Sequence, residues 1–432
     1  MKNFKSSLFT FLCTALFFNS YGQNKEFYFG TKTKTDSGIV INNSNLYTDA
    51  LGYGFDCNSS ANVKLNDKSM IGDKSIYFSV KLPEGNYKVD LIIGGDKAAN
   101  TTVKAESRRL MLKEIKTKDK EIVRQSFVVN VRTPKIDAGH KISLKKREYS
   151  YLNWDDKLTL EFSGNLMIES IKITLVPGFK RLFLVGDTTV ADQDLEPWGS
   201  WGQFITNYFT ADLVVANYAE SGGGTLKSFK ASRRLDKVFA EIKKGDYLFI
   251  ESAHNDEKEK GEGAGAWGEY SSLLKEYITK TREKGGIPVF LTPIQRRHFK
   301  SDGTLQPTHG EFPDAMRKIA TDLNVPLIDI TKMTTEMYES WGDQASKKAF
   351  VQYPANTFPG QTTKLEDNTQ LNSFGANEVA KCVVQGIKDL NLGIAKFIKT
   401  EIPNYNPKKP ASFSDWTVPM SSRFEIAKQD EN

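Results

Sequence analysis

Cysteine and histidine are scarce in this 432-residue sequence, which contains three of the former and four of the latter. Cys13 lies in an apolar N-terminal run and follows Leu12 rather than a small residue, so we expect no lipoprotein anchor. Cys57 and Cys382 fall in segments that the patterns below assign to different domains, and we expect no disulfide between them. No spacing of these residues is typical of a zinc site. The sequence therefore predicts neither a metal site nor a cofactor.

Long apolar runs and clusters of basic residues are scarce as well. The run from Leu8 to Phe18 follows Lys2 and Lys5 and precedes Ser20-Tyr21-Gly22, a pattern typical of a secretory signal peptide over residues 1–22. It is too short to span a membrane in the mature protein, so we expect a secreted or periplasmic protein without a membrane anchor. The net charge is +6, and no Lys/Arg block with interleaved aromatic residues indicates nucleic-acid binding. The mild positive charge suits an acidic oligo- or polysaccharide partner.

The first half of the mature chain, residues 24–178, has the pattern of an antiparallel β domain. Tyr77–Leu82 and Tyr87–Leu91 alternate between apolar and polar residues on either side of Pro83-Glu84-Gly85-Asn86, which predicts a β-hairpin. Further short strands are expected at 126–131, 157–162 and 168–175. Many short strands separated by turns favour a β-sandwich. It would serve either as a carbohydrate-binding-like module or as a structural spacer.

After Pro177-Gly178 the pattern changes to alternating strands and helices, over residues 179–398. Each strand candidate is a continuous apolar run, and each helix candidate is amphipathic. Such alternation predicts a parallel sheet covered by helices on both faces. We expect the strands at 182–185, 213–216, 247–250, 288–291 and 325–328, and the helices at 201–209, 232–243, 266–284, 313–323 and 372–389. Residues 399–432 read as an extended C-terminal tail anchored by Trp416.

Four polar stretches follow strands or precede helices in this second domain. They are Gly186-Asp187-Thr188-Thr189, Asn217–Gly222, Ala253-His254-Asn255-Asp256 and Asp367-Asn368-Thr369-Gln370. Parallel α/β folds place their sites at the carboxyl edge of the sheet, so we expect all four stretches to converge there.

These stretches, taken in order, resemble the SGNH hydrolases, and within them the rhamnogalacturonan acetylesterase-like branch. The resemblance covers roughly residues 180–395 and implies a three-layer α/β/α sandwich with a flavodoxin-like sheet. Phe27–Gly30 and Gly52–Phe55 are similar to the galactose-binding-like module that precedes some of these esterases. The chemistry that the resemblance implies is serine ester hydrolysis.

Residue by residue, the resemblance is incomplete. Gly222 and Asn255 match the oxyanion-hole positions, and Asp367 matches the acid that orients the catalytic histidine. Thr188, however, stands where the nucleophilic serine belongs, and Gln370 stands where the histidine belongs. Threonine keeps a hydroxyl but crowds it with a methyl group, and glutamine cannot accept and return a proton near pH 7. Losing triad members typically costs on the order of 10⁴–10⁶ in turnover.

Several other residues are candidates for substrate contact or proton transfer, and each also has a structural interpretation. Asp187 is a polar feature of the expected pocket. His254 is either a structural or substrate-contacting residue or an acid or base for different chemistry. Tyr218 is either a proton donor or a pocket wall. Arg233, Arg234, Arg296 and Arg297 either bind a uronate carboxylate or lie on solvated faces.

Three functions are compatible with this pattern. Because the triad is incomplete, we favour an enzyme that degrades an acidic, uronic-acid-containing polysaccharide by elimination, as a lyase or dehydratase with a His or Tyr taking the C5 proton. The first alternative is a rhamnogalacturonan-type O-acetylesterase with Thr188 as a slow nucleophile and His254 as its base. The second alternative is an inactive protein that only binds glycans.

Overall fold

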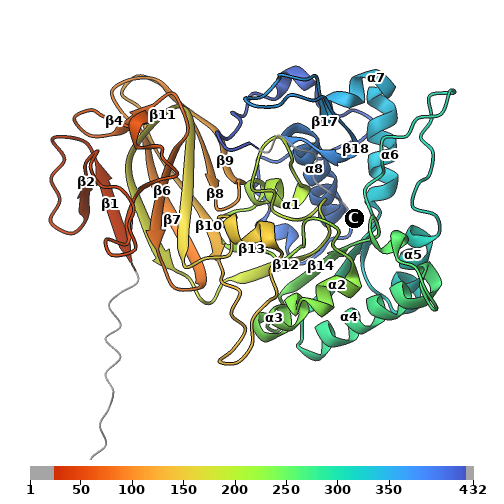
Figure 1. Ribbon diagram of the computed structural model, residues 1–432. Coiled ribbons are helices and arrows are strands. Elements are labelled where there is room, and N and C mark those ends of the chain that lie inside the picture. Colours follow the sequence, from red (N-terminus) through yellow and green to blue (C-terminus); the bar gives the residue numbers. More distant parts are fainter. Residues whose placement is uncertain (1–23, 425–432) are drawn as a thin grey trace, which may run out of the picture.

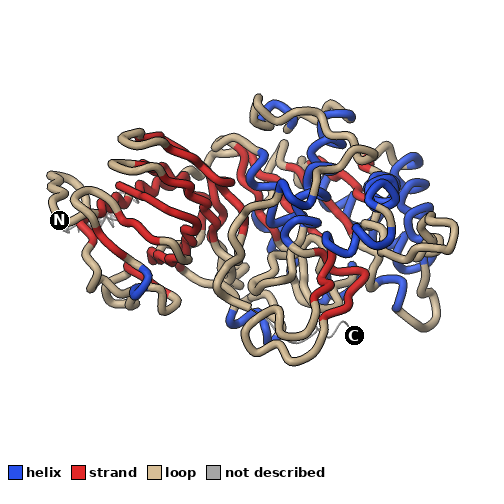
Figure 2. Tube along the Cα trace, turned by 90° about the horizontal axis from the view of Figure 1, so that it is seen from above, coloured by secondary structure: helices blue, strands red, loops and turns tan. Residues whose placement is uncertain are grey.

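The computed structural model describes residues 24–424 and shows two bodies packed directly against each other (Figure 1). The signal peptide expected at residues 1–22 lies outside the described residues. Viewed from above, the strands of the N-terminal body gather at one end of the molecule and most helices lie at the other (Figure 2). Among the described residues, no helix is both long and apolar enough to cross a membrane.

The N-terminal body is an eleven-stranded β structure organised around one long strand, β11 (Lys157–Leu175). The first half of β11 pairs with β6 and β8, and its second half pairs with β5, β7 and β1. An aromatic core that includes Phe27, Phe29, Phe55 and Phe78 lies inside this body. The other strands are β1 (Lys25–Phe29), β2 (Ile39–Ile41), β3 (Tyr53–Asp56), β4 (Lys64–Leu65), β5 (Met70–Gly72), β6 (Ile76–Lys81), β7 (Gly85–Gly94), β8 (Ala99–Ala105), β9 (Arg109–Thr117) and β10 (Ile122–Val131).

The predicted hairpin is wrong, although both of its strands exist. β6 pairs with β3 and β11, whereas β7 pairs with β10 and β11, so the turn at Pro83-Glu84 connects strands that are not neighbours. Alternation shows that one face of a strand is buried, but it does not identify the neighbouring strand. Likewise, the strands expected at 157–162 and 168–175 are two halves of β11.

The C-terminal body contains a five-stranded parallel sheet in the order β13-β12-β14-β15-β16. The apolar runs that predicted strands form β12 (Lys180–Gly186), β13 (Leu213–Asn217), β14 (Tyr247–Glu251), β15 (Ile287–Leu291) and β16 (Leu327–Ile328). A separate antiparallel pair consists of β17 (Phe350–Tyr353) and β18 (Leu365–Leu371). Together with the β body, this arrangement confirms the expected α/β fold class.

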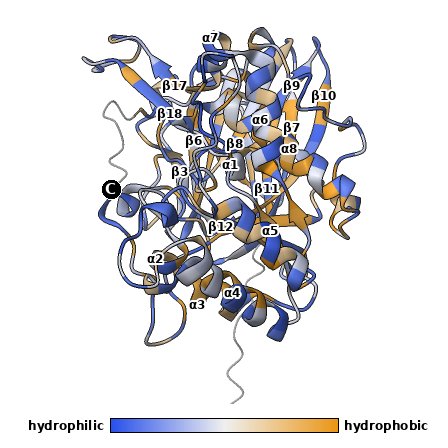
Figure 3. Ribbon diagram, turned by 90° about the vertical axis from the view of Figure 1, so that its right-hand side faces the viewer, coloured by the Kyte–Doolittle hydropathy of each residue, from blue (hydrophilic) through white to orange (hydrophobic). Residues whose placement is uncertain are grey.

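Helices cover both faces of the parallel sheet, as the alternation along β12 requires. Leu182 and Leu184 pack with α1, α6 and α8 on one face, whereas Phe183 and Val185 pack with α2 to α5 on the other. The strands are largely apolar, and the outer helices mix apolar and polar residues (Figure 3). The helices are α1 (Trp201–Phe204), α2 (Leu226–Ala231), α3 (Arg234–Glu241), α4 (Ser271–Glu283), α5 (Phe312–Asp322), α6 (Ile330–Trp341), α7 (Asp343–Ser346) and α8 (Ser373–Asp389).

Buried ion pairs join the two bodies. Arg109 and Arg132 of the β body both bind Asp192, which follows β12, at 2.8 and 3.1 Å. Arg108 pairs with Glu196 at 2.5 Å. The C-terminal tail packs back onto the same region, where Trp416 contacts Phe204 and Phe374 as the sequence predicts. The β body therefore braces the loop that follows β12.

Candidate active site

The candidate site lies at the carboxyl ends of β12 and β14, where the strand order reverses direction. The chain passes from β12 to β13 on one side and then to β14 on the other, and open α/β sheets bind ligands at such a switch point. β12 ends at Gly186 and is followed by Asp187 and Thr188, and Ser252 to Asn255 follow β14. These two stretches of the sequence prediction therefore meet at one edge.

Thr188 is held close to the oxyanion-hole glycine that the sequence predicts. The backbone N–H of Gly222 donates a hydrogen bond to Thr188 Oγ1 at 3.2 Å, and Gln193 Nε2 donates to the Thr188 carbonyl at 2.8 Å. Gly222 has φ +74°, a left-handed conformation that favours glycine. Only 1% of Thr188 is exposed. A hydroxyl and a backbone donor thus face each other in a largely buried position.

Lys145 of the β body helps to orient this donor. Its ammonium group donates to the carbonyl of Ser221 at 3.4 Å and to the carbonyl of Gly222, and it pairs with Glu220 at 2.9 Å. In a trans peptide the C=O of Ser221 and the N–H of Gly222 point in opposite directions. Because Lys145 holds that carbonyl on one side, the Gly222 N–H is directed to the other side, toward Thr188.

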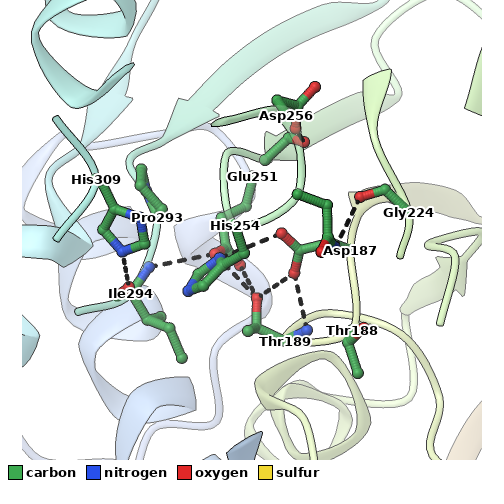
Figure 4. A network of polar contacts seen from close by, with 12 residues as sticks. Asp187, Thr188, Thr189, Gly224, Glu251, His254, Asp256, Pro293, Ile294 and His309 are labelled. Carbon is green, nitrogen blue, oxygen red and sulfur yellow. Dashed lines mark hydrogen bonds and ion pairs between the residues drawn. The ribbon is translucent and has the colours of Figure 1, made fainter. Parts of the chain in front are cut away.

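A buried polar network lies beside Thr188 (Figure 4). Asp187 accepts hydrogen bonds from the backbone and hydroxyl of Thr189 at 3.0 and 2.8 Å, and it pairs with His254 Nδ1 at 3.2 Å. Glu251, at the end of β14, accepts from Trp201 Nε1 at 2.7 Å and lies 3.0 Å from Thr189 Oγ1, whose single proton the Asp187 and Glu251 carboxyl groups share. The network fixes the backbone on both sides of Thr188.

The charges in this network are set by burial and by one ion pair. Burial and the nearby Asp187 carboxylate raise the pKa of Glu251 to about 7. Burial alone would raise the pKa of Asp187, but the His254 charge and the Thr189 hydrogen bonds outweigh it and lower that pKa. Burial would likewise lower the pKa of His254, and Asp187 reverses the shift so that it is raised. Asp187 and His254 therefore form an ion pair inside the protein.

Among residues 24–424, Asp187, Glu251 and His254 are also the acidic and histidine side chains that lie close enough together to hold a metal ion. One ligand atom each from Asp187, Glu251 and His254 lies within 4.8 Å of the others. All three are buried, and their oxygen and Nδ1 atoms already bond to one another, to Thr189 or to Trp201. Of the nitrogen and oxygen atoms of His254, Asp187 and Glu251 in this group, His254 Nε2 is buried without a hydrogen-bond partner in the described chain.

Among the described residues, the ring of His254 contacts Asp187 and His309 and forms no hydrogen bond with Thr188. Its Nδ1 faces Asp187, its Nε2 is buried without a hydrogen-bond partner in the described chain, and only 2% of the residue is exposed. Its ring packs edge-on against His309 at 4.6 Å between centroids. Because Nδ1 is occupied by Asp187 and the ring is enclosed, we assign His254 to holding Asp187 in place.

Asn255, the second expected oxyanion-hole residue, lies next to the Gly222 loop. Its Nδ2 donates to the carbonyl of Gly224 at 3.2 Å, and its Oδ1 accepts from Lys258 at 3.1 Å. The next residue, Asp256, accepts from the backbone N–H of Leu226 at 2.9 Å. These contacts tie the loop after β14 to the loop after β13, which carries Gly222.

Asp367 and Gln370 lie on β18, and not in a loop or a helix cap. The Asp367 carboxylate accepts hydrogen bonds from the backbone N–H groups of Thr369 at 2.8 Å and Gln370 at 2.9 Å. Gln370 is buried, with 2% of the residue exposed. One oxygen of the carboxylate that the resemblance assigns to orienting a histidine, Oδ1, therefore binds the backbone of the strand that carries Gln370.

The remaining sequence candidates all have partners within the protein. Tyr218 is fully buried, and its hydroxyl donates to Glu241 at 2.8 Å, so it is a core residue. Arg234, also fully buried, pairs with Glu148 at 2.5 Å. Arg233 is half-exposed and pairs with Asp236. Arg296 pairs with Glu257, and Arg297 pairs with Asp343. Each arginine proposed to bind a uronate already has a carboxylate partner.

Sequence reasoning missed the contribution of the β10–β11 connection, residues 132–156. This segment carries Lys145 and Arg147, and both side chains reach the Gly222 loop. A signal was present, because the connection is far longer than the two to five residues of a hairpin loop, and long loops are often functional.

The sheet order and the residues at its switch point define the class, an SGNH-type hydrolase domain with an added β domain. No protein-family model matches the chain. Rhamnogalacturonan acetylesterase RhgT of Bacillus subtilis (strain 168) is 39% identical over 214 residues, which cover 49% of this chain and 91% of that protein. The probable rhamnogalacturonan acetylesterase YesY of the same organism is 33% identical and covers 51% of this chain and 98% of its own length. The chain belongs to the rhamnogalacturonan acetylesterase family of the SGNH hydrolases.

One further relative is similar along most of the chain. The uncharacterized esterase YxiM of Bacillus subtilis (strain 168) is 23% identical over 388 residues, which cover 86% of this chain and 92% of that protein. The crystal structure of YxiM aligns with 86% of this chain and 99% of its own, at a TM-score of 0.46 and 19% identity.

Proposed function

We propose that this protein is a secreted or periplasmic carbohydrate O-acetylesterase that acts on an acidic polysaccharide, with Thr188 as its nucleophile. The observation that carries the proposal is the 3.2 Å hydrogen bond from the Gly222 N–H to Thr188 Oγ1 at the switch point of the sheet. This hydrogen bond holds the Thr188 hydroxyl next to a backbone N–H that can stabilise an oxyanion. The acetylesterase names of RhgT and YesY support the reaction type.

The reaction follows from these groups. Thr188 Oγ1 attacks the acetyl carbonyl, and the charge that develops on its oxygen is stabilised by the Gly222 N–H and the Asn255 amide. The sugar oxygen leaves and takes up a proton, and water then hydrolyses the acetyl-threonine ester. Because Gln370 cannot accept the Thr188 proton, that proton passes to hydroxide or water. The enzyme therefore turns over slowly compared with one that has a complete triad.

Asp187 and His254 contribute by position. Their ion pair and the Thr189 hydrogen bonds fix the backbone immediately before and after Thr188. A rigid backbone keeps the Thr188 hydroxyl at one distance from the Gly222 N–H, and such preorganisation is what a donor to an oxyanion needs.

Elimination from a uronic acid remains a second candidate, for one reason. Because residue 370 is glutamine, the general base that ester hydrolysis uses is missing. Elimination needs a base for the C5 proton and a cation for the carboxylate, and neither of these two groups has to lie at position 370. The acetylesterase relatives favour deacetylation over this candidate.

One experiment separates the two reactions. The mature protein is incubated with acetylated pectic oligosaccharides and with the same oligosaccharides after chemical deacetylation, and both acetate and ultraviolet absorbance are followed. Deacetylation gives acetate from the first substrate and no absorbing product from either. An unsaturated, absorbing product from the deacetylated substrate would replace our proposal with elimination, and no product from either substrate would reject both.

A further inference from the structure

The guanidinium of Arg147 lies directly over the oxyanion-hole glycine. Arg147 belongs to a short 3-10 turn, Lys146–Ser150, in the β10–β11 connection. A methyl group added to Gly222 would overlap the Nη2, Cζ and Nε atoms of Arg147, so the side chain packs on the Gly222 α-carbon. The N–H of the same glycine donates to Thr188. A cation from the β body thus reaches the residue that contacts the proposed nucleophile.

This guanidinium differs from the other arginines around the site because it has no ion-pair partner among residues 24–424. Arg234, Arg296 and Arg297 are each paired with a carboxylate of the protein, and Arg132 shares Asp192 with Arg109. Arg147 forms none of these pairs, and its side chain is only half-buried. Its positive charge is therefore available to a ligand.

The segment that carries Arg147 is held firmly on both sides of it. Two residues before it, Lys145 binds the carbonyls of Ser221 and Gly222. One residue after it, Glu148 is buried and binds Arg234 through both carboxylate oxygens, at 2.6 and 2.5 Å. A half-exposed arginine between two such contacts is held at the site, which lowers the entropy lost when it binds a ligand.

We propose that Arg147 binds the carboxylate of a uronic acid residue next to the ester, so that the β body completes the active site. The inference rests on the proposed function for the location of the reacting group. A planar guanidinium with two parallel N–H donors matches a carboxylate, and this geometry gives a directional bond. The β body then has a defined role in substrate selection, in place of the two open interpretations of a separate sugar-binding module or a spacer.

Binding, measured without any reaction, tests this assignment. Isothermal titration calorimetry compares tri-galacturonate with its carboxyl-reduced, neutral analogue, for the wild type and three variants. Arg147→Met removes the guanidinium, and Arg147→Lys keeps the charge without the two-donor fork. Arg124→Met is the matched control, because Arg124 is an exposed arginine of β10 that likewise has no ion pair in the described chain.

We expect the wild type to bind the acidic trimer more tightly than the neutral one. Loss of a charge-assisted hydrogen-bond pair weakens acidic binding by about 10- to 100-fold in Arg147→Met, and less in Arg147→Lys, with neutral binding unchanged. Arg124→Met should behave as the wild type. Equal binding of both trimers by the wild type, or unchanged acidic binding in Arg147→Met, would overturn the proposal. Carboxylate-dependent binding without acetate release would instead contradict only the proposed reaction.

Discussion

Arg234→Met should destabilise the protein strongly, because it leaves a charge buried without a partner. Arg234 is fully buried, and Glu148 is 2% exposed. Two Nη2–carboxylate contacts of 2.6 and 2.5 Å join them across the two bodies. Removing one member of such a pair typically costs 3–5 kcal/mol, roughly a 4–6 °C fall in Tm for a chain of this length, at about 2.1 cal/mol/K of unfolding entropy per residue. Thermal unfolding followed by circular dichroism measures the shift.

The neighbouring residue supplies the control. Arg233 pairs with Asp236 at the surface, with side-chain exposures of 42% and 49%, so Arg233→Met should cost less than about 1 kcal/mol. A double variant, Arg234→Met with Glu148→Met, leaves no unpaired charge and should recover much of the lost stability. If Arg234→Met and Arg233→Met had the same Tm, or if the double variant were as unstable as Arg234→Met, the reasoning would fail.

Three further predictions address the site. Acetate release by the wild type should rise with hydroxide concentration without levelling off near pH 7. In a double variant, Thr188→Ser with Gln370→His, the rate of acetate release should increase by at least tenfold and level off with an imidazole-like pKa. A plateau already present in the wild type would reveal a base that we have not identified. Gly222→Ala should abolish acetate release, because the methyl group displaces Arg147 and the positive φ is strained; wild-type rates would contradict the contact. Burial raises the pKa of Asp256 from 3.8 to about 7, so the folded state favours the protonated carboxyl, and this residue's contribution to stability is complete below pH 4 and is lost as pH rises to 7. The free energy of unfolding should therefore fall by at most roughly 4 kcal/mol between pH 4 and 8 in urea unfolding, and Asp256→Asn should flatten that fall. An unchanged slope in Asp256→Asn would contradict the pKa shift.

The parallel sheet could be predicted because its signal is local. Leu182–Val185 is a continuous apolar run whose residues pack alternately against the two helical layers, and the same holds for the strands beside it. The polar residues that end β12 and β14 must then meet at the carboxyl edge. The hairpin prediction failed because the partners of β7 are β10 and β11, which both come later in the chain, and no local pattern identifies them.

The roles of charged residues could be predicted least. Arg234 and Arg147 are the same residue type in polar surroundings, and only their partners separate a buried structural pair from an available cation. Arg234 pairs with a residue of the other body and Arg147 packs on Gly222 of the other body, so both environments depend on how the two bodies pack. Thr188 and Gln370 were identified from the resemblance, and the structure adds the Gly222 hydrogen bond and the strand position of Gln370.

Thr188→Val tests the central claim most directly, because it removes the hydroxyl and keeps the shape of the side chain. Acetate released from acetylated pectic oligosaccharides is measured for the wild type, for Thr188→Val, and for Thr210→Val, a control in the loop before β13. The account predicts release by the wild type and Thr210→Val, and none above the uncatalysed rate by Thr188→Val at unchanged Tm. Acetate release by Thr188→Val at the wild-type rate would contradict it.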